Sequence, residues 1–366
     1  MRWMLGILAM GILGGNSLPT HADRDIVYAA RYYNAPGSRG TSHVHLYRIN
    51  PDGTGRTRLT SGSGDDSQPQ WSPDGNYLAF VRITDSPTLS NSVFCALCMI
   101  PARGGKIRVL HRYDHRVDYR WTHNGKALFD GQHVIPLSGS RRDPRIANQA
   151  NDGVPSPNGR YIYSNGDGTD DPGTLIDRPR GRKIPTQIHL DSPLWLDDHQ
   201  LVGAVDTHGD TPGICVIGSD GKILHRSRLH LVPPTSKPED TPGGGHFVLQ
   251  AIPGDTNHVG WWGDISNSTI RPDWVFYQAD AQTGGVSRMG EGQFLAWSPD
   301  GSRYCTANRS LIPFSKRKDG TTRVVWGASL MMVNPRNGTA KNITPGKVLV
   351  EEAAWRQSGH HRRPRR

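Results

Sequence analysis

The chain has 366 residues, of which 35% are hydrophobic and 21% are charged, and its formal net charge at pH 7 is +10. Glycine (43) and proline (27) are abundant, which is typical of many short strands joined by turns. Ten tryptophans and a regular internal repeat argue against a disordered chain, and the length fits one domain of repeated strands.

The N-terminus has the pattern of an export signal. Met1 and Arg2 form a short positive region, Trp3–Gly14 is apolar, and Thr20–Ala22 offers small residues where a signal peptidase cuts. About twelve apolar residues are too few to span a bilayer, so a membrane anchor is the weaker alternative and no membrane span is expected. We predict a signal peptide over 1–22, cleavage after Ala22, and a periplasmic or secreted protein.

A short phrase recurs along the rest of the chain. Five copies end in glycine, two further copies are degenerate, and the mean period is about 47 residues, a spacing typical of propellers and solenoids. The glycine-terminated copies are Trp71–Gly75, Trp121–Gly125, Pro155–Gly159, Trp297–Gly301 and Trp355–Gly359, and the degenerate ones are Trp195–His199 and Ala251–Asp255.

Each phrase is predicted to be a hairpin turn. Asp-Gly and Asn-Gly supply the positive φ angles of tight turns, and an alternating stretch such as Tyr77–Val81 follows the phrase as a strand. Most units contain a second turn, for example Pro51–Gly53 after the strand 45–49. Two hairpins make a four-stranded antiparallel blade, so seven phrases predict an all-β, seven-bladed β-propeller, with six blades as the alternative.

The two ends of the chain are predicted to close the ring. Ile26–Ala30 matches the second strand of a blade, and Glu351–Trp355 matches the first. If the last strand completes the blade that the N-terminus begins, no unpaired sheet edge remains between the terminal blades. The propeller is therefore expected to span 23–359, followed by a basic, disordered tail over 360–366.

The repeat text resembles the TolB-like propeller repeats of bacterial envelope proteins. The similarity is carried by His45–Gly55, Arg58–Thr60, Gln70–Gly75 and Tyr77–Phe80, and again by the segments around 297 and 331–344. TolB itself resembles an α/β domain followed by six blades, whereas here the mature chain is predicted to be propeller throughout. The resemblance therefore implies the fold of TolB-like propellers and not TolB's particular partner.

The four cysteines are Cys95, Cys98, Cys215 and Cys305. Cys95 and Cys98 lie in a predicted strand, where residues three apart point to opposite faces and their Cα atoms are about 10 Å apart. A disulfide needs less than about 7 Å, and a zinc ribbon would need a second such pair. Buried structural thiols are the expected state.

Long loops are predicted to share one face of the propeller, where binding residues of such scaffolds lie. They include 83–92, 111–117, 232–246 and 307–325. The candidate ligand-binding residues on this face are His111, Asp114, His115, His189 and His246. The segment around His246 is faintly similar to oligogalacturonate lyases, which implies His246 as a ligand of one divalent metal ion.

No catalytic constellation is visible. The chain has no Gly-x-Ser-x-Gly elbow, no phosphate-binding loop and no dinucleotide fingerprint. We therefore predict a non-catalytic binding or scaffold module without a cofactor, and a metal-dependent enzyme of oligogalacturonate lyase type is the alternative. The positive charge predicts an envelope protein or an acidic polymer as partner, and export makes nucleic acid an unsuitable one.

Overall fold

The computed structural model describes residues 25–33, 43–85, 93–122, 125–130, 133–137, 153–165, 171–205, 213–228, 248–264 and 274–356. The predicted signal peptide, the tail over 360–366 and His246 lie outside these residues and stay predictions. Regular structure in the described part consists of 27 strands and one short 3-10 helix, η2 (Arg178–Arg180). The all-β prediction is confirmed.

Four sheets have four antiparallel strands each, in chain order. They are β4 (Asp65–Trp71), β5 (Tyr77–Asp85), β6 (Val93–Pro101) and β7 (Arg108–Tyr113); β11 (Val154–Pro155), β12 (Tyr161–Ser164), β13 (Thr174–Asp177) and β14 (Arg182–Pro185); β15 (Asp191–Trp195), β16 (Gln200–Val205), β17 (Gly213–Gly218) and β18 (Ile223–Arg228); and β19 (Val248–Ala251), β20 (His258–Asp264), β21 (Trp274–Asp280) and β22 (Val286–Glu291).

Two further sheets differ from this pattern. One has three strands, β8 (Arg120–Trp121), β9 (Ala127–Phe129) and β10 (Val134–Pro136). The other has eight: β23 (Gln293–Trp297), β24 (Tyr304–Lys316), β25 (Thr322–Val333), β26 (Ala340–Asn342), β27 (Val348–Trp355), β1 (Ile26–Tyr32), β2 (His45–Ile49) and β3 (Thr57–Arg58).

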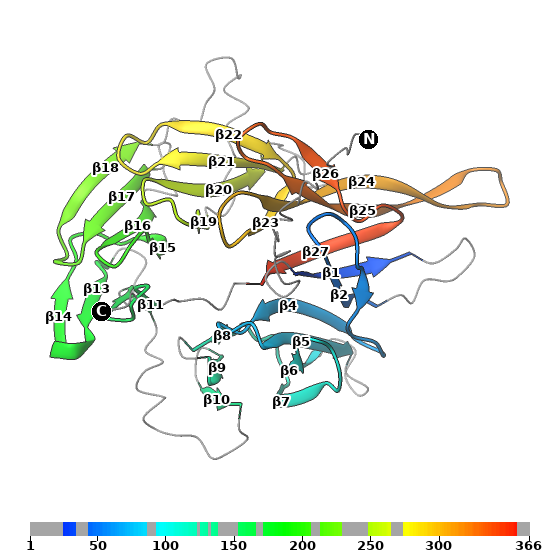
Figure 1. Ribbon diagram of the computed structural model, residues 1–366, viewed down its shortest axis with the longest axis horizontal. Helices are drawn as coiled ribbons and strands as arrows, with labels where there is room; N and C mark the ends of the chain where they lie inside the picture. The colour runs from blue at the N-terminus through cyan, green and yellow to red at the C-terminus, as the bar shows by residue number, and fades with distance from the viewer. Residues whose placement is uncertain are drawn as a thin grey trace, which may run out of the picture.

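The sheets surround a common centre, with β4, β8, β11, β15, β19, β23 and β27 innermost (Figure 1). This arrangement is a β-propeller with four-stranded antiparallel blades. The predicted number of blades, seven with six as the alternative, is wrong for the described part of the chain, where five sheets have four or more strands. One reason is that a parallel bridge between Ala328 and Leu349 joins the strands of two successive repeats into the eight-stranded sheet.

The predicted pairing of the chain ends is confirmed. Strand β27 pairs antiparallel with β1, and Ile26 lies opposite Trp355. Strand β1 pairs with β2 on its other side, so the first and last strands lie inside one sheet. This pairing protects both of these edges from pairing with another chain.

The repeated phrases that are described in full form the predicted turns, whereas Trp121–Gly125 and Trp355–Gly359 include residues outside the described part. In the first copy the Gly75 amide donates to the Ser72 carbonyl oxygen at 2.8 Å, and Gly75 has a φ of 68°. The side chains that open four copies are almost fully buried, each with 7% of its surface exposed: Trp71, Trp195, Trp297 and Trp355. The phrase therefore ends one strand, reverses the chain, and anchors the turn in the core.

The core lies between neighbouring sheets. Val27 and Leu46 of the terminal sheet pack with Trp71 and Phe80 of the next, and Val202 of β16 packs with Trp261 of β20. Fully burying a side chain of this size contributes about 1.5–3 kcal/mol. Because both of these clusters join neighbouring sheets, apolar burial holds these sheets in order around the centre.

All four cysteines are free and buried, as predicted. Burial raises the pKa of the Cys98 and Cys215 thiols to about 11. No helix among the described residues is long and apolar enough to cross a membrane.

One expected loop has a different structure. Residues 307–325 were predicted as a loop, but most of them belong to β24 and β25, which form a long hairpin. It projects from the side of the molecule (Figure 1).

Candidate functional site

A cavity of about 1040 Å³ lies where the chain passes from the outer strand β7 to the inner strand β8. The connection 111–120 forms much of its wall, and Phe94 at the start of β6 adds to it. The start of β6 and the connection between the two sheets therefore lie on the same side of the cavity. The remaining wall comes from Phe129, Asp130, His133 and Gly153.

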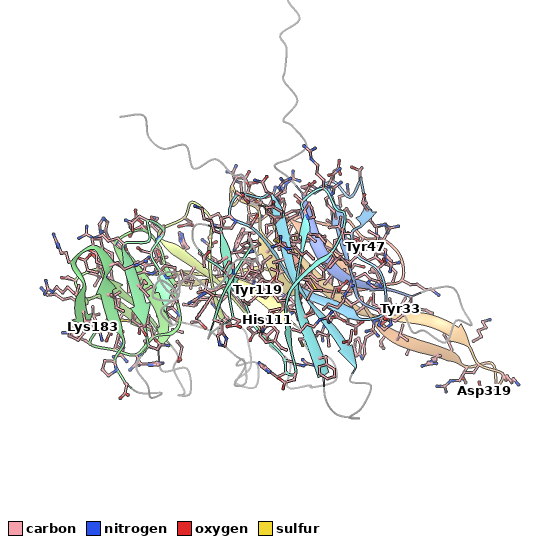
Figure 2. The ribbon with its side chains drawn as sticks, turned by 90° about the horizontal axis from the view of Figure 1, so that it is seen from below. Tyr33, Tyr47, His111, Tyr119, Lys183 and Asp319 are labelled. Carbon is pink, nitrogen blue, oxygen red and sulfur yellow. The ribbon has the colours of Figure 1, made fainter. Side chains whose placement is uncertain are left out.

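Three of the five predicted site residues, His111, Asp114 and His115, line this cavity. Figure 2 labels His111 and Tyr119, which both contribute to its wall. His111 and Asp114 come from the end of β7 and the residue after it, and His115 follows. Their closeness in sequence already predicts closeness in space.

Tyr113 is the fixed element of one wall. Its hydroxyl donates to Oδ2 of Asp130 at 2.9 Å, and the Asp130 side chain is only 3% exposed. Its ring meets the imidazoles of His111 and His115 edge to face, with centroids 4.7 and 5.6 Å apart. Burial and the hydrogen bond to Asp130 raise the pKa of Tyr113, so this phenol holds the wall and stays protonated.

The other wall is fixed to the inner strand β4. Tyr119 is 6% exposed, and its hydroxyl donates to the Gln68 carbonyl oxygen at 2.6 Å. The Gln68 amide group donates to Oδ1 of Asp118 at 2.7 Å. Gln68 itself has a φ of 53°, a left-handed conformation rare for a residue with a side chain. These contacts fix the connection between the two sheets.

Arg120 completes this wall. Its guanidinium lies 4.9 Å from the centre of the Phe129 ring and donates to the Gly153 carbonyl oxygen at 3.0 Å. A guanidinium over an aromatic face is a favourable contact that also holds the arginine in place.

The lining of the cavity contains both acidic and basic side chains. Each of its three carboxylates has a hydrogen-bond partner: Asp114 with His115 at 2.8 Å, Asp118 with Gln68, and Asp130 with Tyr113. The bond with His115 lowers the pKa of Asp114. Arg112 and Arg116 are exposed on the lining. The lining therefore combines aromatic residues with charges of both signs, and the exposed Arg112 and Arg116 are its cationic groups available to an anionic ligand.

The two other predicted site residues lie elsewhere. His189 precedes β15; its Nδ1 is 3.1 Å from the Asp171 carbonyl oxygen and its Nε2 is 3.5 Å from Oδ1 of Asp191. It is not part of the cavity wall. His246 lies outside the described residues, and among the residues that are described no group of three or more His, Cys, Asp or Glu side chains could hold a metal ion.

Sequence reasoning missed several residues of the wall. Tyr113, Arg116 and Tyr119 belong to the same stretch as the predicted histidines, in which aromatic and basic residues alternate. That alternation was the available signal. Phe129, Asp130 and His133 come from the next sheet, and no local pattern links them to residue 113.

Comparison with known proteins supports the fold. No protein-family model matches the sequence, and no curated protein matches it. Among solved structures, a putative 6-phosphogluconolactonase from Bacteroides fragilis is similar with a TM-score of 0.50 and 13% identity, over 92% of this chain and 99% of that one. The fold is a β-propeller.

Two other similar structures belong to the two kinds of protein that the sequence resembles. TolB from Acinetobacter baumannii is 14% identical, with a TM-score of 0.47, over 94% of this chain and 69% of that one. An oligogalacturonate lyase in complex with manganese is 13% identical, with a TM-score of 0.34, over 88% and 81%. The resemblance to TolB-like propellers, and not to TolB itself, stands on the sequence repeat and the propeller fold, and neither of these two similarities carries a function to the chain.

Proposed function

We propose that this protein is an exported, non-catalytic binding or scaffold module that binds an envelope protein or a polyanionic ligand, with the cavity at 111–120 as its ligand site. The export part rests on the signal-peptide pattern of 1–22. The binding part rests on a rigid scaffold that holds a large cavity on its loop face.

The observation that carries the proposal is the composition of the cavity wall. The Phe94 ring, 39% exposed, offers surface for stacking, while the exposed Arg112 and Arg116 offer charge-assisted hydrogen bonds. An acidic oligosaccharide presents both sugar faces and carboxylates. We therefore propose acidic saccharides as the first ligand class for this cavity.

The test is isothermal titration calorimetry of the mature protein with oligogalacturonate, and with a neutral maltooligosaccharide of equal length. We expect binding of the acidic chain only. The double variant R112A/R116A removes two cationic groups and should weaken binding about tenfold or more, because hydrogen bonds to charged groups contribute about 1.5–3 kcal/mol each.

The matched control is R180A/R182A, which removes two exposed arginines near β14. It should bind like the wild type. Equal loss in both variants would show that only net charge matters, and absence of binding would reject acidic saccharides and favour an envelope protein as partner. The lyase alternative would be favoured by cleavage of the oligosaccharide that depends on added divalent metal and on His246.

A further inference from the structure

The hairpin β24–β25 extends beyond the sheet to which it belongs. Strand β23 pairs with β24 only as far as Ala307, and the bridge of β27 to β25 is at Ala328. From Arg309 to Trp326 the described strands pair only with each other. A two-stranded ribbon is marginally stable in water by itself, so a ribbon of this length indicates a further contact in the working molecule.

One face of the ribbon is apolar and exposed. Leu311 lies directly opposite Trp326, and Pro313 lies opposite Val324. Residues two apart on a strand share a face, so these four side chains form one continuous surface, which we name the hairpin face. The exposed fractions of Leu311, Val324 and Trp326 are 42%, 48% and 37%.

The ribbon is tied to the body at its base. Tyr33 follows β1 directly in the chain. Its hydroxyl donates a hydrogen bond to the Trp326 carbonyl oxygen at 2.8 Å. This bond holds the backbone at Trp326 and leaves the indole part of the hairpin face. The face is therefore presented in a defined direction.

The ribbon carries a large excess of positive charge. Residues 309–326 contain five cationic side chains and one acidic one: Arg309, Lys316, Arg317, Lys318 and Arg323, with Asp319. The Asp319 carboxylate accepts hydrogen bonds from the Thr321 amide at 2.9 Å and the Thr321 hydroxyl at 2.6 Å, which lower its pKa. The Asp319 carboxylate stays ionised, and its hydrogen bonds stabilise the turn. Because the cationic side chains outnumber this one carboxylate, the net charge at the tip is positive and attracts anions.

An anionic lipid surface fits this combination. Tryptophan and aliphatic side chains enter the boundary between headgroups and acyl chains, while lysine and arginine pair with lipid phosphates. A stable protein interface requires about 800 Å² from each partner, whereas the hairpin face is a narrow strip with cations around it. A uniform, negatively charged layer suits such a strip better than a folded partner does.

We propose that the hairpin face and the basic turn 316–323 dock the protein on a membrane surface rich in anionic phospholipid. Docking is peripheral, with no segment crossing the bilayer. The surface is separate from the cavity at 111–120, as the positions of Asp319 and His111 in Figure 2 show, so it does not depend on the proposed ligand.

The experiment is co-sedimentation of the mature protein with vesicles of phosphatidylcholine alone and of phosphatidylcholine with about 30% phosphatidylglycerol. We expect binding to the anionic vesicles only, and weaker binding at high salt. The variant K316E/R317E/K318E changes exposed residues at and beside the turn and should lower the partition coefficient at least tenfold. L311S/V324S keeps the charge and should also lower it several-fold.

The matched control is R180E/R182E/K183E. It reverses three exposed charges near β14, at the opposite end of the molecule from Asp319 (Figure 2). This variant should keep the wild-type partition coefficient. Circular dichroism melts of all variants identify any loss of fold.

Three results would overturn the proposal. One is absence of sedimentation with anionic vesicles. A second is an equal loss in the hairpin and control variants, which would mean attraction by net charge alone. The third is unchanged binding in L311S/V324S, which would show that the hairpin face does not contact the lipid. If the first result occurs and the hairpin captures an acidic protein, the partner is a protein in place of lipid.

Discussion

Asp66 is a residue on which the fold of the inner strand β4 depends. Its carboxylate is fully buried and accepts two hydrogen bonds from Arg82, at 2.7 and 2.9 Å, while Nδ1 of His45 lies 3.4 Å away. Asp66→Asn leaves the Arg82 guanidinium, 20% exposed, without its counter-charge. We expect a loss of about 3 kcal/mol in the free energy of unfolding, measured by urea denaturation.

The control for Asp66 is an exposed pair of the same chemistry. Glu291 accepts a hydrogen bond from Arg288 at 2.9 Å, with side chains 73% and 53% exposed. Glu291→Gln should change stability by less than about 1 kcal/mol, since water screens exposed pairs. Similar losses in both variants would contradict the assignment of Asp66–Arg82 as a structural pair.

At the scale of elements, the repeated turns contact one another between neighbouring sheets. A Cβ at Gly301 would lie 2.5 Å from the Pro253 carbonyl oxygen in the turn of the preceding sheet, whereas a Cβ at Gly338 would meet nothing within 4 Å. Their φ angles are 66° and 67°. Gly338→Ala should therefore cost about 1–2 kcal/mol, the left-handed backbone alone, and Gly301→Ala about 1–3 kcal/mol more.

The two glycine variants are compared by thermal and urea unfolding. Because the backbone angles match, the difference between them reports the contact between turns. Equal destabilisation would mean that the turns do not pack as the structure shows.

At the scale of the whole molecule, the pairing of β27 with β1 closes the propeller. Deletion of 348–366 removes β27 and exposes the edge of β1 and the buried side chains Tyr28 and Ile26. We expect loss of cooperative unfolding and association into oligomers, measured by calorimetry and light scattering. Deletion of 357–366 keeps β27 and should leave the melting temperature unchanged; a stable monomer after the longer deletion would contradict closure by this strand.

The sequence alone determined the local features. The Gly75 and Gly301 turns and the buried free thiols were predictable, because turn chemistry and cysteine spacing act over a few residues. The pairing of β1 with β27 joins distant segments, and it was predictable because the repeat assigns the two strands to one blade. That His111, Asp114 and His115 lie close together was predictable because one short stretch of the chain contains them.

Only the tertiary structure decided how separate segments meet. The sheet count depends on one bridge between Ala328 and Leu349, and the cavity depends on Tyr113 reaching Asp130 in the next sheet. The projection of β24–β25 depends on where β23 and β27 stop pairing with it. Contacts between sheets come from packing of distant residues, which a single sequence does not encode in any local pattern.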